Sequence, residues 1–437
     1  MTVTNWSTDL IAKIEARVAR VGVVGLGYVG LPLCLQALEA GFEVIGFDID
    51  RNRLASIGRS ESYLVDVTNE QLAQADQSGR FTTTDDPSAT GTMDVILIAV
   101  PTPLVGGVPD LSFVFQAVDG LVPYLRTGLL VSLESTTYPG TTEETLVPRL
   151  ETGGLTAGED FALVFSPERI DPGNHAFAFS QIPKVVGGLT PRCSAVAESF
   201  YSSIVDKVVV VSGPREAEMT KLLENTYRQV NIALANEFAM VAHELDIDIW
   251  EVIAAASTKP FGFHPFYPGI GIGGHCIAVD PVYLTWRIRE LGRAPFRLVE
   301  LAREVDMSMP RYVARRIIQV LMDDGVSIEG ADIFVLGLTY KPDVDDIRES
   351  RAIDVFAELA KAGAAVSFHD PFRQEADVKG TIYPRRDLDR GLDDADLVAI
   401  LTHHSSYDWP DIVLRSARVF DARGVTRKLK GDNIRRL

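Results

Sequence analysis

The sequence predicts an α/β protein in which two parallel-sheet domains are joined by a long central helix. Short apolar, β-branched runs alternate with helical patterns through most of the 437 residues, and this alternation is typical of parallel strands with crossover helices. The alternation stops at Gly213-Pro214, where a long helical pattern begins, and it restarts near Ala331. We therefore expect an N-terminal domain at 1–213, a central helical domain at 214–310 and a C-terminal domain at 311–437.

Each sheet is predicted from short apolar runs that are bounded by turns. The runs of the first domain are Arg20–Gly25, Glu43–Phe47, Val95–Val100, Leu129–Leu133, Ala162–Phe165, Lys184–Gly187 and Lys207–Val211, with a helix at Tyr28–Ala40. The runs of the C-terminal domain are Ala331–Leu336, Ala364–Asp370, Leu397–Thr402 and Val419–Asp421, with a helix at Ala352–Ala362.

The central domain is predicted to contain one long helix. From Arg215 to about Leu245 the sequence has neither proline nor glycine, and between Val230 and Ala242 its only charged residue is Glu237. A helix that is uncharged on all sides is usually buried. We expect it to form the hinge of the molecule and the core of a homodimer, although a long helix inside one domain would show the same pattern.

Two further segments complete the central region. Phe261–Pro281 is dense in glycine and proline, which predicts a loop. Leu298–Asp324 is helical again, and Pro310 predicts a break in that helix.

Composition excludes several classes of function. The chain has 42 basic and 60 acidic residues and a net charge of −18, so its surface should repel nucleic acid and anionic membranes. Charged residues interrupt the first twenty positions, and no apolar run reaches the roughly 18 residues of a membrane-spanning helix. Its three scattered cysteines indicate a reducing compartment without disulfides. We expect a cytoplasmic protein with no membrane insertion and no nucleic-acid partner.

A dinucleotide-binding signature opens the chain. Gly25-Leu26-Gly27-Tyr28-Val29-Gly30 lies between a predicted strand and a predicted helix, which is where a Rossmann-like domain binds pyrophosphate. Asp48 ends the second strand, where an acid binds the ribose hydroxyls and repels a 2′-phosphate. The pattern favours NAD as the cofactor, although a glycine turn can serve a fold that binds something else. Arg53 follows closely and is either an adenosine contact or an ordinary surface arginine.

Cys276 predicts the chemistry. It follows Gly273-Gly274, and Asp280 stands four residues later. A nicotinamide cofactor accepts hydride from an alcohol carbon, but the resulting aldehyde offers no second hydride until a nucleophile adds to it. A thiolate would form a thiohemiacetal, then a thioester that water cleaves to an acid. Cys276 therefore points to oxidation beyond the aldehyde, although a buried inert cysteine would look the same in sequence.

The long helix offers two further candidates. Lys221 and Asn225 are four residues apart and so share one helical face. A lysine and an amide that face a cleft can stabilise an oxyanion. The neighbouring Glu218 and Glu224 instead indicate a solvated face, so both interpretations stay open.

Two strand ends carry the remaining candidates. Glu168 follows the strand at Ala162–Phe165 and could act as a base, and Thr136 follows an earlier strand and could hold a water. Both are also ordinary residue types at strand ends. His275 is expected to be structural, because neighbours in sequence need not face one another.

These motifs together resemble the nucleotide-sugar 6-dehydrogenases that act on UDP-glucose, UDP-N-acetylglucosamine and UDP-N-acetylmannosamine. The resemblance runs from about Val21 to Thr426 and rests on ordered motifs. They are Val24–Pro32, Val100–Leu104 with Thr102, Glu134–Thr137, Ser166–Asn174, Lys221–Asn225, Gly273–Pro281, Gly337–Pro342 and Asp345–Ser350. The Ser166–Asn174 motif and the segments Phe266–Gly269 and Tyr283–Trp286 resemble the UDP-N-acetylglucosamine branch most.

The resemblance implies a role for each matched residue. Cys276 becomes the thioester nucleophile, with Lys221, Asn225 and Asp280 handling oxyanion and water, and with Glu168 and Thr136 as the acid–base and water-positioning pair. Residues implied in NAD binding are Gly25, Gly27, Tyr28, Val29, Gly30, Asp48, Arg53, Thr102, Thr136 and Arg348. Residues implied in substrate binding are Glu168, Arg169, Lys221, Asn225, Gly273 and Lys341. The family's C-terminal domain binds UDP, and its central helix forms a dimer; no metal is assigned.

The chain departs from the family pattern at three places. Ile270 and Ala278 replace prolines that are common in the loop around Cys276, so we expect a looser loop. Asp306-Met307 stands where Asn-Asp is frequent. No reactive group is lost.

The sequence thus predicts a four-electron oxidation of the C6 alcohol of UDP-N-acetylglucosamine to its uronic acid, for polysaccharide synthesis. UDP-glucose and UDP-N-acetylmannosamine remain alternative substrates. A catalytically silent NAD-binding scaffold and a one-step hydroxyacid dehydrogenase are rivals from other classes.

Overall fold

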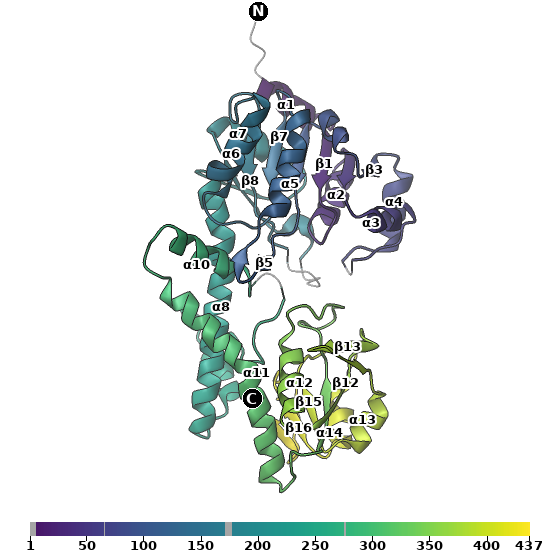
Figure 1. The fold of residues 1–437 in the computed structure, drawn as a ribbon, viewed down its shortest axis with the longest axis vertical. Helices are drawn as coiled ribbons and strands as arrows, with labels where there is room; N and C mark the ends of the chain where they lie inside the picture. The colour runs from purple at the N-terminus through teal and green to yellow at the C-terminus, as the bar shows by residue number, and fades with distance from the viewer. Residues whose placement is uncertain (1–5, 65, 171–176, 275–276) are drawn as a thin grey trace, which may run out of the picture. The chain divides into compact units, whose positions relative to one another are not determined.

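The computed structural model describes residues 6–64, 66–170, 177–274 and 277–437. The described chain divides into two compact units. The first contains residues up to Glu224 together with Val282–Arg293, and the second contains Asn225–Pro281 and Ala294–Leu437. Figure 1 follows the chain from purple at the N-terminus to yellow at the C-terminus.

The first unit is built on one eight-stranded sheet. Its strand order is β10 (Val208–Val211), β9 (Lys184–Gly188), β8 (Ala162–Phe165), β7 (Leu130–Leu133), β4 (Val95–Ile98), β1 (Arg20–Val24), β2 (Glu43–Phe47) and β3 (Phe81–Thr84). The direction of strand progression reverses between β1 and β4, which makes their carboxyl ends the expected ligand-binding edge. All seven predicted strands are confirmed within two residues at each end, and β3 was not predicted.

Helices cover this sheet. They are α1 (Trp6–Glu15), α2 (Gly30–Glu39), α3 (Arg51–Gly58), α4 (Asn69–Gln77), α5 (Ser112–Leu121), α6 (Val147–Leu150) and α7 (Pro191–Tyr201). Between the elements lie a short hairpin of β5 (Leu104–Val105) with β6 (Val108–Pro109), and a π-helical turn at Thr141–Leu146. Apolar side chains of α1, α2 and α7 join those of β1, β2 and β4 in one continuous core.

One strand pair departs from the predicted parallel arrangement. β8 and β9 are antiparallel, whereas every other neighbouring pair in this sheet is parallel. A parallel pair needs a long crossover connection, usually a helix. The described residues between β8 and β9 form only a short 3₁₀ turn at Phe179–Gln181, so the connection runs to an antiparallel neighbour instead.

The second unit has a smaller, fully parallel sheet. Its strand order is β12 (Ala365–His369), β11 (Asp332–Leu336), β15 (Leu397–Ile400), β16 (Val419–Asp421) and β17 (Ile434–Arg436). The helices around it include α9 (Ile249–Ala256), α11 (Arg297–Asp323), α12 (Arg351–Lys361), α13 (Leu388–Asp394) and α14 (Trp409–Arg415), and β13 (Glu375–Val378) pairs with β14 (Thr381–Pro384) as a hairpin. The fold class predicted for the C-terminal region is confirmed, with its reversal point between β11 and β15.

The two long central helices differ from expectation in one respect. The predicted helix from Arg215 is α8 (Pro214–Glu244), and it is unbroken over 31 residues. The predicted break at Pro310 is wrong, because α11 continues through that residue. Residues Met309, Pro310 and Val313 are buried, so packing around the proline supports a continuous helix there.

Among the described residues, no helix combines the length and the apolar character needed to cross a membrane.

Candidate functional site

The glycine turn after β1 has the backbone that the sequence predicts. Gly25 has a φ of +94°, and a Cβ there would lie 2.6 Å from the carbonyl oxygen of Ala99, which follows β4. A Cβ on Gly30 would lie 1.7 Å from the carbonyl oxygen of Gly25, so only glycine lets α2 begin this close to the strand. A Cβ on Gly27 would meet no neighbouring atom within 4 Å, so open space faces the backbone there.

Asp48 is fixed beside this turn. It is buried, and its Oδ2 accepts a hydrogen bond from the Leu26 amide at 2.8 Å and from Arg53 Nη1 at 3.2 Å. Its Oδ1 accepts a hydrogen bond from the Asp50 amide at 2.8 Å. The carboxylate therefore lies at the carboxyl end of β2, next to the glycine turn, as predicted for a ribose ligand.

These features fit a dinucleotide. The space in front of Gly27 leaves room for a pyrophosphate, and the N-terminus of α2 carries no side-chain cap on Val29. Uncapped amides and the helix dipole both favour an anion at that position. The predicted Tyr28 lies in the same turn and is 43% exposed.

The other predicted cofactor residues lie on different segments. Thr102 follows β4, and its carbonyl oxygen accepts a hydrogen bond from Tyr283 Oη at 3.0 Å. Thr136 is half-buried after β7, on the same edge of the sheet. Arg348 belongs to the second unit, where its guanidinium pairs with Asp346.

Glu168 is buried rather than free at its strand end. Its Oε2 pairs with Lys184 Nζ at 2.9 Å, and its Oε1 accepts hydrogen bonds from the amides of Arg169 and Ile170 at 2.6 and 2.8 Å. Arg169 is also engaged, through Glu224 and the Pro183 carbonyl. The Glu168 carboxylate is therefore held in one orientation.

Lys184 joins Glu168 to a second buried carboxylate that the sequence analysis did not single out. Its Nζ lies 2.5 Å from Glu134 Oε2, and Glu134 also accepts a hydrogen bond from Tyr201. Burial lowers the pKa of Lys184, but Glu134 and Glu168 outweigh that effect and raise it above its usual value. Burial raises the pKa of Glu134. A lysine at the start of an otherwise apolar buried strand, β9, was the available signal.

The solvated-face interpretation of the helix around Lys221 is wrong at Glu218. Glu218 is 1% exposed, and its carboxylate accepts hydrogen bonds from the Gly140 amide at 2.6 Å and from the Thr142 amide and hydroxyl at 2.9 and 2.7 Å. It thereby caps the π-helical turn at Thr141–Leu146. The fold satisfies this carboxylate with groups 76 to 78 residues away in sequence, which no helical pattern could reveal. Lys221 itself is half-buried.

The structure brings Asn225 and Asp280 together. Asn225 Nδ2 donates a hydrogen bond to Asp280 Oδ2 at 2.6 Å, although 55 residues separate them. Both side chains are buried, and Asp280 is the first residue of α10 (Asp280–Glu290). A buried amide that fixes a buried carboxylate is a suitable arrangement for orienting a water or an oxyanion.

Cys276 and His275 lie outside the described residues. The described segment before them ends at Gly273-Gly274, which packs against Tyr340: a Cβ on Gly273 would lie 2.9 Å from the Tyr340 Cβ. Lys341, the next residue, is half-buried after the carboxyl end of β11. Gly273 and Lys341 are thus near one another in the second unit.

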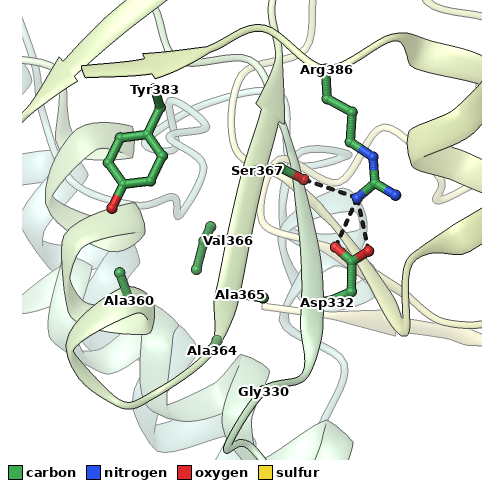
Figure 2. A pocket seen from close by; sticks show the side chains of 9 residues that line it. All are labelled: Gly330, Asp332, Ala360, Ala364, Ala365, Val366, Ser367, Tyr383 and Arg386. Atoms are coloured by element: carbon green, nitrogen blue, oxygen red, sulfur yellow. Dashed lines mark hydrogen bonds and ion pairs between the residues drawn. The ribbon is translucent and has the colours of Figure 1, made fainter. Parts of the chain in front are cut away.

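A pocket of about 610 Å³ lies elsewhere in the second unit. Figure 2 shows Arg386 over Asp332 and Ser367 on one side and Tyr383 on the other; Arg386 Nη1 lies 2.8 and 2.9 Å from the two Asp332 oxygens. Asp332 begins β11 and Ala365 begins β12. The pocket is therefore at the amino ends of the strands, opposite the edge where such sheets bind ligands.

A dinucleotide turn in one Rossmann-like unit and a second such sheet in the other define a nucleotide-dependent dehydrogenase. The signature of the UDP-glucose/GDP-mannose dehydrogenase family matches the chain in three parts: its NAD binding domain at residues 19–205, its central domain at 215–308 and its UDP binding domain at 334–428. The chain belongs to this family. It is an NAD-dependent UDP-sugar dehydrogenase, an oxidoreductase, as the motifs predicted.

Named relatives include enzymes of different sugars. A UDP-N-acetyl-D-glucosamine 6-dehydrogenase from Pseudomonas aeruginosa is 37% identical over 359 residues, covering 81% of this chain and 83% of the relative. A UDP-N-acetyl-D-mannosamine dehydrogenase from Pyrococcus horikoshii is 33% identical, covering 94% and 96%. The solved structure of a UDP-D-ManNAc dehydrogenase from P. horikoshii superposes with a TM-score of 0.86 at 32% identity, covering 95% of this chain and 98% of that one.

Proposed function

We propose that this enzyme oxidises the C6 alcohol of a UDP-N-acetylhexosamine to the carboxylate, and that UDP-N-acetylglucosamine is its substrate. The observation that carries the proposal is the buried Asn225–Asp280 pair, because Asp280 stands four residues after Cys276 and would orient water and oxyanion beside that thiol. The balanced reaction consumes one alcohol, two NAD⁺ and one water, and yields one carboxylate, two NADH and three protons.

The chain's residues divide the chemistry as follows. NAD, when bound at the Gly25–Gly30 turn, accepts the hydrides. Asp280 and Lys221 hold the water that takes the alcohol proton. The Cys276 thiolate then adds to the aldehyde carbon and forms a thiohemiacetal, whose oxygen Lys221 and Asn225 stabilise. After the second oxidation, water attacks the thioester carbonyl and the thiolate leaves.

The two described cysteines support Cys276 as the nucleophile. Cys34 and Cys193 are both 0% exposed and lie in the core of the first unit. Burial raises the pKa of the Cys34 thiol, so it stays protonated and inert. Cys276 is the third and last cysteine of the sequence.

The remaining site assignments complete the proposal. Glu168, fixed by Lys184, and Thr136 position the hydrolytic water. Asp48 binds the adenosine ribose, and Arg53, Thr102, Thr136 and Arg348 are further cofactor contacts. Arg169, Gly273 and Lys341 contact the substrate.

Three domains would carry these roles. Residues 1–213 bind NAD, residues 214–310 supply the dimer helix and the cysteine loop, and residues 311–437 bind UDP. We place the reaction in the cytoplasm, where activated sugars are prepared for polysaccharide synthesis.

UDP-N-acetylmannosamine is the second candidate substrate, because relatives and solved structures similar to this chain bear that name. UDP-glucose is the third, since a UDP-glucose dehydrogenase structure is similar at 28% identity.

We also propose a homodimer through α8. In the second unit this helix and the residue that follows it expose apolar side chains at Tyr227, Leu234, Phe238, Val241 and Leu245, each between 46% and 63% exposed. Their spacing of three, four or seven residues places them on one helical stripe. Such a stripe is what a second copy would cover. Light scattering should give a dimer for the natural chain and a monomer for Phe238→Glu.

The central experiment measures NADH released per sugar with all three UDP-sugars. UDP-N-acetylglucosamine should give two NADH and one uronic acid, with the highest kcat/KM of the three. Cys276→Ser should still bind NAD but lose turnover, whereas the matched Cys193→Ser should keep it. One NADH per sugar would identify a one-step dehydrogenase, NAD binding without turnover in the natural enzyme would identify a silent scaffold, and full activity in Cys276→Ser would refute the covalent step.

A further inference from the structure

The loop that leads into the nucleophile is anchored at its start. The Gly269 amide donates a hydrogen bond to Asn236 Oδ1 at 2.9 Å. Ile270, which we expected to loosen this loop, is 1% exposed and belongs to the same apolar core as Met309 and Val313 of α11. The segment before Cys276 is therefore docked on the second unit.

Asp306 holds the middle of the loop. It is 2% exposed on α11, and its Oδ1 accepts a hydrogen bond from the Ile272 amide at 2.6 Å. Pro310, one turn later, has no N–H to give the Asp306 carbonyl, so the helix ladder is interrupted where the loop approaches. A Cβ on Gly271, whose φ is +105°, would lie 3.0 Å from that carbonyl oxygen. Backbone thus meets backbone at this contact.

Arg351 closes the contact from the other side. As the first residue of α12, it donates from Nε to the Ile272 carbonyl at 3.1 Å, and its Nη2 lies 3.5 Å from Asp306 Oδ2. The amide and the carbonyl of Ile272 are therefore both bound, one by each member of an ion pair. Burial raises the pKa of Asp306 to about 6, although Arg351 and the Ile272 amide act in the opposite direction.

Tyr340 completes the packing near the end of the described segment. A Cβ on Gly274 would lie 2.7 Å from its ring, so the ring lies directly on the loop backbone. Asp354 accepts a hydrogen bond from Arg351 Nη1 at 3.2 Å and also pairs with Lys379, away from the Ile272 contact.

We propose that Asp306 and Arg351 are positioning residues that fix Ile272, and through it the approach of Cys276 to the half-oxidised sugar. The proposal rests on the covalent function proposed above. Neither residue touches substrate or cofactor; each acts through the backbone that carries the thiol. Without them the first oxidation would continue, but the aldehyde would be captured less often.

The test uses full-length enzyme with Asp306→Ala, Asp306→Asn, Arg351→Met and Arg351→Lys. Asp306→Ala and Arg351→Met should lower kcat about 10- to 100-fold, equivalent to roughly 1.4 to 2.7 kcal/mol, while the Kd for NAD stays within about twofold. NADH per sugar consumed should fall from two towards one, and semicarbazide should trap the escaping aldehyde. The conservative Asp306→Asn and Arg351→Lys should recover part of both losses.

Asp354→Asn is the matched control, because it breaks the outer ion pair and leaves Ile272 bound. It should keep natural kcat and stoichiometry. Folding is checked by thiol labelling, since Cys34 and Cys193 are buried and stay unlabelled in a folded chain. If Asp306→Ala fails to fold, the pair Arg351→Met and Arg351→Lys decides.

Two results would overturn the positioning role. One is natural kcat and two NADH per sugar in the folded Asp306→Ala and Arg351→Met variants. The other is an equal loss in Asp354→Asn. A natural enzyme that itself yields one NADH would instead refute the proposed function, so the two failures are distinguishable.

Discussion

The turn after β1 in the first sheet and the turn after β11 in the second have the same backbone hydrogen bonds, but they differ at the third residue of the turn. After β1, the Gly25 amide donates a hydrogen bond to the Phe47 carbonyl at 2.8 Å, and Asp48 accepts one from the Leu26 amide. After β11, the Gly337 amide donates a hydrogen bond to the His369 carbonyl at 2.9 Å, and Asp370 accepts one from the Leu338 amide at 2.7 Å. Each glycine has a positive φ and packs on the strand beyond the reversal point.

The two turns differ at the position two residues after Gly25 and Gly337. Gly27 leaves open space, whereas its counterpart Thr339 is 0% exposed and donates its hydroxyl to the Lys341 carbonyl at 3.0 Å. The helix also starts at once in the first unit, at Gly30, but only at Arg351 in the second. The same frame therefore admits a pyrophosphate in one unit and holds a longer loop in the other.

The acids at the ends of the second strands, Asp48 and Asp370, also have different partners. Asp48 is buried, but it pairs with Arg53, whose side chain is 39% exposed. Asp370 is 0% exposed and accepts a hydrogen bond from His404 Nε2 at 3.1 Å. His404 Nδ1 accepts from the Asp343 amide at 3.0 Å, which assigns the proton to Nε2. The acid that we propose to bind the cofactor in the first unit therefore corresponds to a fully buried acid in the second.

The largest effect is expected when Gly27 is replaced by threonine, the residue type at the corresponding position of the second unit. Gly27→Thr should raise the Kd for NAD about 1,000-fold, or roughly 4 kcal/mol, because the side chain fills the pyrophosphate space. The melting temperature should change little, since no neighbouring atom lies within 4 Å. Calorimetric titration with NAD measures the effect, and Gly120→Thr, at another open glycine, is the control. Tight NAD binding by Gly27→Thr would contradict the assignment of the space.

Asp370 should matter more for the stability of the fold than Asp48. Asp370→Asn should lower the free energy of unfolding by about 3 kcal/mol. Both Asp370 oxygens accept hydrogen bonds from backbone amides, so the NH₂ group of an asparagine would face a donor in either orientation. Asp48→Asn should cost less, about 1 kcal/mol, because Asp48 accepts three hydrogen bonds against four at Asp370, and one of the three comes from the partly exposed Arg53. Urea denaturation of both variants checks the order, and equal losses would remove the distinction.

The preference for NAD over NADP should change when Asp48 is substituted and not when Asp370 is. Asp48→Asn should weaken NAD binding about tenfold, or 1.4 kcal/mol, and narrow the preference over NADP because the repulsion of a 2′-phosphate is gone. Asp370→Asn should leave both dissociation constants unchanged. Titration of each variant with NAD and NADP makes the comparison, and an altered NADP affinity in Asp370→Asn would speak against it.

The smallest effect concerns acid sensitivity. Burial alone would raise the pKa of Asp370, but hydrogen bonds from His404 and backbone amides outweigh it, so the pKa lies below its usual value. Its folded-state pKa is thus below the unfolded one, near 4, and the stabilisation is complete above that value and lost as pH falls further. The stability advantage of the natural chain over Asp370→Asn should shrink by about 1 kcal/mol per pH unit below about pH 4. Urea titrations at pH 5 and pH 3.5 would show it, and a constant advantage would contradict the direction.

Most of the fold and the cofactor turn could be predicted because their signals are local. A strand such as Glu43–Phe47 is encoded by its own apolar run, and the Gly25–Gly30 spacing encodes its own turn. The hydrogen-bond and ion-pair partners of the buried side chains could not be predicted in this way. The Lys184 bridge, the Glu218 cap and the Arg351 contact each join residues far apart in the chain, so no window of sequence contains both members.

By itself the sequence determined the two Rossmann-like sheets, the long helix and the residue types of the candidate site, since periodicity and short motifs act over a few neighbouring residues. Tertiary structure alone decided which carboxylates are buried and what each one binds. Only the folded structure shows that Asn225 binds Asp280 and that Asp306 binds Ile272. It also shows that β9 is antiparallel to β8 and that α11 continues through Pro310. Burial, hydrogen-bond pairing and strand direction depend on which distant segments pack together, and that is settled only when the chain has folded.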